Sequence, residues 1–231
     1  MSLSVEEGRF VSLVGPSGSG KSSLLRALIG LQKPLTGSVE TGLARSQLGI
    51  LFQDDALLPW KTARDNVALG LAFAGLERAK ALAEADAWLG RLGLAGFGDR
   101  FPRHLSGGQR KRVALAQVLA MKPRLILMDE PFASLDAIVR ARIIKDVVAL
   151  VERERISVLL VTHDLEEAIS LSDDVYLLSR GPRARITQHY PVTIPRPRDP
   201  VRSRTHAAFG PLYERLWADL SQEVDYQVEA A

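Results

Sequence analysis

The stretch GPSGSGKS, residues Gly15–Ser22, decides the fold of this chain. It follows the apolar run RFVSLV (Arg9–Val14) and precedes a helical pattern from about Ser22 to Leu31. The pattern G-x-x-x-x-G-K-[ST] between a strand and a helix is typical of a phosphate-binding loop, or P-loop. Its glycines let backbone N–H groups close around phosphates, and the helix N-terminus adds a favourable dipole. The alternative, a chance glycine turn, does not explain why strand, helix and Lys-Ser pair occur together.

The P-loop assigns roles to its own residues. Lys21 is predicted to reach the β- and γ-phosphates of a nucleotide, and the Ser22 hydroxyl to ligate Mg²⁺. The residues predicted to contact the nucleotide here are Gly15, Pro16, Ser17, Gly18, Ser19, Gly20, Lys21, Ser22 and Ser23.

Other apolar runs predict more strands of the same kind. The predicted strands are Arg9–Val14, Leu48–Phe52, Arg124–Met128, Ile156–Val161 and Val175–Leu178. LILM and VLLV are continuously apolar, as expected for strands that helices cover on both faces of a parallel sheet. Later predicted helices are Ser106–Ala120, Asp136–Glu154 and Leu165–Leu171. The alternation predicts an α/β fold with a mostly parallel sheet.

A helix-rich stretch interrupts this alternation. From Asp65 to Leu94 the pattern is helical, with Leu82, Leu89 and Leu92 on one face. We therefore predict a P-loop NTPase core over residues 1–60 and 109–185, and an inserted helical subdomain over 61–108. Residues 186–231 are predicted to form a C-terminal extension.

The composition changes after Arg180. Residues 180–204 contain five prolines and seven arginines, which favours irregular extended chain. We interpret these arginines as solvated, with contact to anionic lipid head groups as the alternative. A closing amphipathic helix, Phe209–Leu220, is expected to pack back on the core.

Charge and composition exclude several classes of protein. Thirty basic against 27 acidic residues give a net charge of +3, too little for the concentrated basic face of a nucleic-acid-binding protein. The absence of cysteine fits a reducing cytosol. The apolar runs are too short to span a bilayer, so a membrane role would need a partner.

The sequence LILMDE (Leu125–Glu130) is predicted to deliver two acids at the end of a buried strand. Asp129 suits Mg²⁺, through a water molecule, and Glu130 suits the deprotonation of an attacking water. The alternative is that these acids cap a following helix. The P-loop elsewhere in the chain makes that alternative minor.

Two more polar residues follow predicted strands. His163 comes after VLLV, and Gln53 comes after LGILF. Open α/β sheets place ligands at the carboxyl ends of their strands, which favours contact of His163 with a γ-phosphate. Gln53 is predicted to bind Mg²⁺ or the attacking water. A lone histidine is also explained as a structural residue, and this alternative stays open for His163.

Taken together, GPSGSGKS, FQDD, LSGGQ, LILMDE, ASLD and VTHD resemble an ATP-binding cassette (ABC) ATPase over about residues 8–180. The resemblance implies ATP, Mg²⁺ and two cassettes that face each other head to tail. The residues implied to complete the partner's ATP site are Ser106, Gly107, Gly108 and Gln109. Asp136, with Ser134 and Leu135, resembles the loop that crosses the dimer interface, and Gln53 resembles the residue that links nucleotide state to the helical subdomain.

The resemblance also implies partners. DDALLPW (Asp54–Trp60) resembles the region where an integral membrane permease docks, which would place the chain at the cytoplasmic face of the cell membrane. Packing of Trp60 between the two lobes is the alternative. FQDDALLPWKTARDNVALGL is similar to the nitrate, sulfonate, taurine and bicarbonate branch of importers, which also use a solute-binding protein. A soluble ATP-gated clamp on nucleic acid is the second hypothesis, although the long coiled coils usual in such clamps are absent.

One departure from that family concerns Phe10. An aromatic residue upstream of the P-loop usually stacks on adenine. Phe10 lies within the predicted P-loop strand instead, where we expect it to point into the core.

Overall fold

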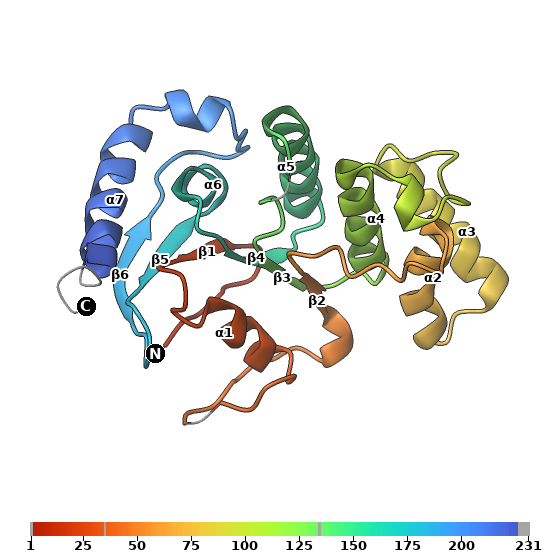
Figure 1. Cartoon of the computed structure of the whole chain (residues 1–231), viewed down its shortest axis with the longest axis horizontal. Coiled ribbons are helices and arrows are strands. Elements are labelled where there is room, and N and C mark those ends of the chain that lie inside the picture. The colour runs from red at the N-terminus through yellow and green to blue at the C-terminus, as the bar shows by residue number, and fades with distance from the viewer. Residues whose placement is uncertain (1, 35, 134, 226–231) are drawn as a thin grey trace.

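Six strands form one sheet in the computed structural model of the chain, which describes residues 2–34, 36–133 and 135–225. The strands are β1 (Phe10–Val14), β2 (Leu48–Leu51), β3 (Leu125–Asp129), β4 (Ser157–Val161), β5 (Asp174–Leu178) and β6 (Ile186–Pro191). Their order across the sheet is β2-β3-β4-β1-β5-β6, and only β6 runs antiparallel to its neighbour (Figure 1). The predicted α/β class with a mostly parallel sheet is confirmed.

Helices cover both faces of this sheet, which explains the continuous apolar runs. Val11 and Leu13 of β1 pack with Leu25 of α1 (Lys21–Leu28) on one face. α5 (Ala137–Arg153) and α6 (Leu165–Leu171) lie on the other (Figure 1). Phe10 belongs to the core cluster that includes α5, so the prediction that it points into the core is confirmed.

Three further helices pack together beside the β2 edge (Figure 1): α2 (Ala63–Phe73), α3 (Arg78–Arg91) and α4 (Gly107–Ala120). The sequence predicted one helical pattern from Asp65 to Leu94, whereas the chain turns between α2 and α3, where Gly75 has a φ of 89°. Glycine ends a helix in this conformation without steric cost. Periodicity did not show the break because both helices turn apolar side chains to one core. None of the helices in the described ranges is long and apolar enough to cross a membrane.

The interpretation of residues 180–204 as irregular extended chain is confirmed for residues 180–185 and 192–201 and is wrong for the rest. Residues Ile186–Pro191 form β6, and Arg202–Thr205 form a 3-10 helix, as Arg45–Gln47 and Pro102–His104 also do. β6 tolerates its proline because this residue ends an edge strand, where no ladder partner needs its N–H. The closing helix is confirmed and longer than predicted: α7 (Phe209–Asp225) buries Phe209 and Leu216 against a cluster that includes α6.

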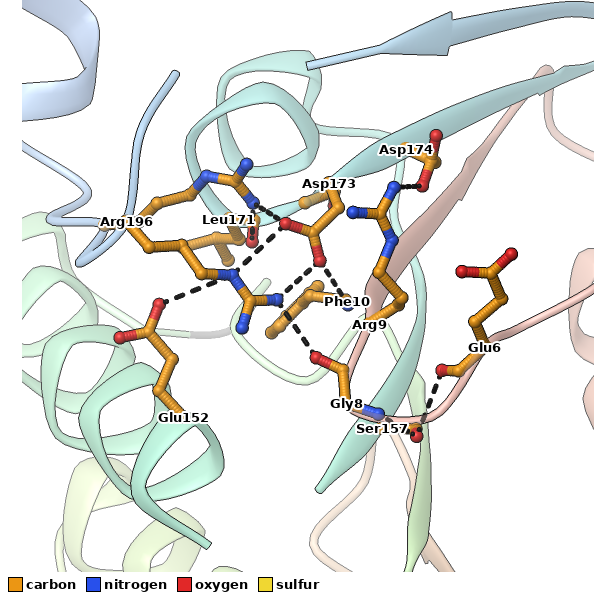
Figure 2. Close-up of polar contacts among 12 residues, drawn as sticks. Glu6, Gly8, Arg9, Phe10, Glu152, Ser157, Leu171, Asp173, Asp174 and Arg196 are labelled. Atoms are coloured by element: carbon orange, nitrogen blue, oxygen red, sulfur yellow. Dashed lines mark hydrogen bonds and ion pairs between the residues drawn. The ribbon is translucent and has the colours of Figure 1, made fainter. Parts of the chain in front are cut away.

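Arg196 pairs with Asp173 (Figure 2), and Arg198 pairs with the same carboxylate. These two arginines hold the C-terminal segment to the core. Arg198 Nη1 lies 3.0 Å from Asp173 Oδ1, and the Arg198 side chain is only 3% exposed. Asp173 Oδ2 also accepts a hydrogen bond of 2.8 Å from the amide of Phe10, the first residue of β1. Burial alone would raise the pKa of Asp173, but the bonds from Arg196 and Phe10 and the charge of Arg198 bring it below its ordinary value. For Arg198 the interpretation as a solvated side chain is wrong, whereas the Arg196 side chain is paired with Asp173 but still 38% exposed.

Candidate active site

A pocket of about 490 Å³ opens at the carboxyl end of the parallel strands. It is lined by Ser17, Gly18, Gly20, Lys21, Ser22, Ser23, Glu130 and His163. These residues come from three segments far apart in the sequence. The P-loop follows β1, Glu130 follows β3, and His163 comes shortly after β4, which lies between the other two strands. The strand order therefore brings the three segments to one edge of the sheet.

The glycines of the P-loop shape this pocket in two ways. Gly18 and Gly20 have φ angles of 77° and 88°, which glycine adopts without steric cost. A Cβ at Gly15 would lie 2.9 Å from Leu178 Cβ, so the loop can start close to β5 only with glycine there. Nothing lies within 4 Å of a Cβ at Gly18 or Gly20, and the loop keeps open space on that side.

The Lys21 ammonium is folded back onto its own loop. Its Nζ donates to the carbonyls of Gly15 and Pro16, both at 2.8 Å, and lies 3.3 Å from Ser19 Oγ. Burial lowers the pKa of Lys21, and the charges of Glu130 and Asp129 oppose that shift. A buried cation held at the mouth of a glycine loop fits a nucleotide phosphate.

Ser22 and Asp129 form the oxygen-rich part of the site. Ser22 Oγ donates to Asp129 Oδ1 at 3.0 Å. Among the described residues, no group of three or more His, Cys, Asp or Glu side chains could hold a metal alone. Mg²⁺ commonly takes one or two protein oxygens and completes its shell with phosphate and water. The Ser22–Asp129 pair fits that kind of binding.

Glu130 and His163 contact each other across the pocket. His163 Nδ1 lies 3.0 Å from Glu130 Oε2. Glu130 has a φ of 43°, and its amide donates to the carbonyl of Val161 on β4 at 2.9 Å. A non-glycine residue in this conformation is uncommon and is held by its surroundings. The backbone therefore fixes the position at the end of β3 from which the Glu130 side chain extends.

Gln53 does not line the pocket. It lies in an exposed loop after β2, and its predicted roles in metal binding and catalysis stay predictions. Its backbone carbonyl accepts a hydrogen bond of 3.1 Å from Lys111 on α4.

Lys111 is a residue that sequence reasoning missed. It is only 1% exposed, and its Nζ pairs with Asp55 at 2.8 Å as well as with the Gln53 carbonyl. The sequence contained a signal for this residue: Lys111 lies one turn before Leu115, so a charged side chain occupies the apolar face of α4. This lysine ties the helix that begins at the LSGGQ motif to the loop that carries Gln53.

The LSGGQ residues lie outside the pocket. Ser106 caps α4 by accepting a bond from the Gln109 amide at 3.3 Å, and the Gln109 side chain accepts from the Ser106 amide at 2.9 Å. Asp136 is exposed and caps α5 through a 3.0 Å bond from Val139 N. Neither cap lines the pocket of its own chain. Of the loop before α5, Ser134 lies outside the described residues and Leu135 is buried.

Gly108→Ala is expected to destabilise the protein by about 1–3 kcal/mol, because it overpacks the contact between α4 and α5. A Cβ at Gly108 would lie 2.6 Å from Val139 Cγ1, and valine in a helix has one strongly preferred rotamer. Gly107→Ala is the matched control, since the nearest atom there is 3.8 Å away. Urea unfolding without nucleotide measures both variants. Equal stability would show that packing does not require glycine at residue 108.

Three comparisons show which known proteins this chain resembles. The model of the ABC transporter family matches residues 1–133. The chain is 46% identical over 207 residues to an aliphatic sulfonates import ATP-binding protein of Rhodococcus jostii, covering 89% of the chain and 81% of that protein. It is 37% identical over 211 residues to a nitrate import ATP-binding protein of Synechocystis, covering 89% and 79%. The fold superposes on the dimeric, post-hydrolysis ATP-binding cassette MJ0796 bound to ADP and Pi, with a TM-score of 0.73, 32% identity and coverage of 83% and 89%.

Proposed function

Because the chain belongs to the ABC transporter family, we propose that it hydrolyses ATP as the nucleotide-binding subunit of an importer. The observation that carries the proposal is the pocket in which Lys21, Ser22, Glu130 and His163 converge at one edge of the sheet. The imported solute is proposed to be a small anion of the sulfonate or nitrate kind, because relatives that take their names from those solutes align with most of this chain.

In this proposal the pocket and the residues next to it bind the phosphates, hold Mg²⁺ and activate water. Lys21 and the P-loop amides bind the β- and γ-phosphates of ATP. Ser22 and Asp129 would hold Mg²⁺, with Gln53 joining them once the loop after β2 approaches. When bound, Mg²⁺ neutralises charge on the β- and γ-phosphate oxygens.

Glu130 is proposed to accept the proton of the attacking water. The water oxygen bonds to the γ-phosphorus, and the bond from that phosphorus to the bridging oxygen breaks. The 3.0 Å contact with His163 keeps the Glu130 carboxylate directed into the pocket, and His163 would also contact the γ-phosphate. Positioning of this kind supplies most of the catalysis in phosphoryl transfer.

A second copy of the chain is the proposed partner for the exposed caps. Ser106, Gly107, Gly108 and Gln109 begin α4 outside their own chain's pocket, as Asp136 begins α5. A helix N-terminus binds anions, and because these N-termini lie outside their own chain's pocket, they would reach the γ-phosphate held by a second subunit. The dimeric state of MJ0796 supports this arrangement.

The loop Leu57–Trp60 is the proposed docking site for the permease. The Trp60 side chain is 71% exposed, so the alternative that it packs between the lobes is wrong. Asn66 of α2 anchors the loop through two hydrogen bonds. Its Oδ1 accepts from Leu58 N at 2.8 Å, and its Nδ2 donates to Thr62 O at 2.9 Å. An exposed indole on a fixed loop suits an apolar partner. Such docking would place the subunit at the cytoplasmic face of the membrane, and a solute-binding protein would contact only the permease.

The alternative of a clamp on nucleic acid is not supported. The net charge is +3, and the similar proteins reported above are import ATP-binding proteins and an ATP-binding cassette.

The experiment that tests the proposal is a pull-down of tagged Glu130→Gln protein from native membranes with Mg-ATP, followed by mass spectrometry. The variant should hold ATP without cleaving it and so retain the closed dimer and its permease. The double variant Lys21→Met/Glu130→Gln is the matched control, because it should not bind ATP and should release the permease. Nucleic acid or only soluble proteins in the eluate would contradict the proposal.

A further inference from the structure

The Glu167 side chain of α6 bonds to Thr162, and Thr162 in turn bonds to Asp164 on the other side of His163. The Thr162 hydroxyl accepts a hydrogen bond from Asp164 N at 3.0 Å and donates to Glu167 Oε2 at 3.1 Å. Thr162 is buried, so its hydroxyl would lose a partner that water cannot easily replace if Glu167 moved. The backbone on both sides of His163 therefore depends on where the Glu167 carboxylate lies.

The same carboxylate faces α5 through Arg140. Arg140 Nη1 lies 3.5 Å from Glu167 Oε1 and 3.2 Å from Asp164 Oδ2. Arg140 belongs to the first turn of α5, because its amide donates to the carbonyl of Asp136 at 2.8 Å. α5 and α6 lie on the same face of the sheet (Figure 1). Arg140 thus connects the exposed start of α5 to the loop that carries His163.

Charged groups from each neighbouring element act on Glu167, which is 6% exposed. Arg140 comes from α5 and Asp164 from the start of α6. A cavity of about 270 Å³ beside them is also lined by Glu166 and Arg204, which pair with each other at 2.8 Å. Burial and then the charge of Asp164 raise the pKa of Glu167 to about 7, against its hydrogen bonds and the charge of Arg140. The charge on Glu167 therefore changes close to neutral pH.

Folding stability does not explain an ionisable side chain at this position. Because the fold raises the pKa of Glu167 from 4.5 to about 7, its favourable contribution exists at low pH and is lost as the pH rises through this range. Above it, the buried carboxylate costs stability, and a neutral side chain of the same shape would be tolerated at least as well. An ionisable group at residue 167 must therefore serve something other than folding stability.

We propose that Glu167 is a positioning residue that, with Arg140, couples the first turn of α5 to the orientation of His163. The inference rests on the proposed ATPase function. When Asp136 engages a second subunit, a shift of the first turn of α5 moves Arg140 relative to Glu167. The bond from Thr162 passes that shift to the His163 backbone and so to the contact between His163 and Glu130. Hydrolysis would in this way depend on the neighbouring subunit.

Glu167→Gln tests the proposal because glutamine keeps the shape but not the charge. At about pH 8, where Glu167 is ionised, kcat is expected to fall roughly 3- to 30-fold, while KM for ATP changes by less than about 2-fold. The wild-type kcat should rise with pH through about 7, and the variant should lack this limb. Arg140→Met should lower kcat similarly, with no further loss in the double variant. Arg140→Lys, which keeps the positive charge, should have a kcat between those of Arg140→Met and wild type.

Glu166→Gln is the matched control, since this neighbouring carboxylate faces Arg204 and not Thr162. Its kcat is expected to stay within about 2-fold of wild type. Thermal unfolding at about pH 8 should show Glu167→Gln no less stable than wild type. An unaltered kcat and pH profile in Glu167→Gln, or a loss of kcat matched by lower stability, would overturn the proposal.

A measurement without nucleotide separates this inference from the proposed function. The ring signals of His163 in ¹⁵N-histidine NMR spectra of the nucleotide-free protein should shift in Glu167→Gln and remain unchanged in Glu166→Gln. If wild-type protein hydrolyses no ATP, the proposed function fails while the spectra still test the coupling. If it hydrolyses ATP and the His163 signals are the same in both variants, the coupling alone is refuted.

Discussion

Glu130→Gln is expected to lower the rate of ATP hydrolysis by about 10²–10⁴-fold, the usual contribution of a general base. Glutamine has the shape of glutamate but cannot take a proton from water at neutral pH. The carboxylate lies at the pocket wall, with Oε2 3.0 Å from His163 Nδ1. The effect should appear in kcat, because the side chain acts on the reaction and not on the binding of the triphosphate.

The measurement is phosphate release at saturating Mg-ATP, with ATP affinity determined separately by calorimetry. ATP affinity is expected to change by less than about 10-fold, since Lys21 and the P-loop amides remain intact. Glu214→Gln on α7 is the control, an exposed carboxylate outside the pocket, and should retain the wild-type rate. A Glu130→Gln rate equal to that of wild type would exclude Glu130 as the base.

Asp173→Ala is expected to destabilise the fold by about 3–5 kcal/mol, a large part of the roughly 5–15 kcal/mol that holds a typical domain folded. The substitution leaves Arg198 buried without its counter-charge. It also removes the acceptor of the Phe10 amide (Figure 2). The loss of stability affects two segments that are far apart in the sequence, because β1 and the segment around Arg196 both bond to this carboxylate. Urea unfolding at neutral pH measures this change in the free energy of unfolding.

Two variants control for other causes of that loss. Asp99→Ala breaks an exposed pair with Arg64, and should cost at most about 1 kcal/mol. Asp173→Ala/Arg198→Met removes both charges and should be more stable than Asp173→Ala alone. Because the fold lowers the pKa of Asp173, its contribution is present above the ordinary pKa of 3.8 and lost as pH falls below it. Equal losses in Asp173→Ala and Asp99→Ala would show that the buried network contributes little.

The predictions from sequence failed where a segment's structure depends on bonding partners elsewhere in the sequence and not on its own composition. The proline- and arginine-rich segment has the composition of irregular chain, yet β6 forms because the edge of β5 offers backbone partners. Arg198 was interpreted as solvated because its partner, Asp173, lies far upstream in the sequence. Lys111 was missed for the same reason: a lysine on an apolar helix face has meaning only once Asp55 is known to face it.

The sequence by itself determined most of the helices and strands, apart from β6 and the break between α2 and α3, and it determined the chemistry within the local motifs. The P-loop, the acids at the end of β3 and the caps Ser106 and Asp136 are local patterns, in which neighbouring residues supply both the geometry and the functional group. Only the tertiary structure decided which of these groups meet. The position of β4 between β1 and β3 brings His163 to Glu130, and the packing of α5 beside α6 brings Arg140 to Glu167. Those contacts depend on strand order and helix packing, which arise from burial summed over the whole chain and leave no local pattern.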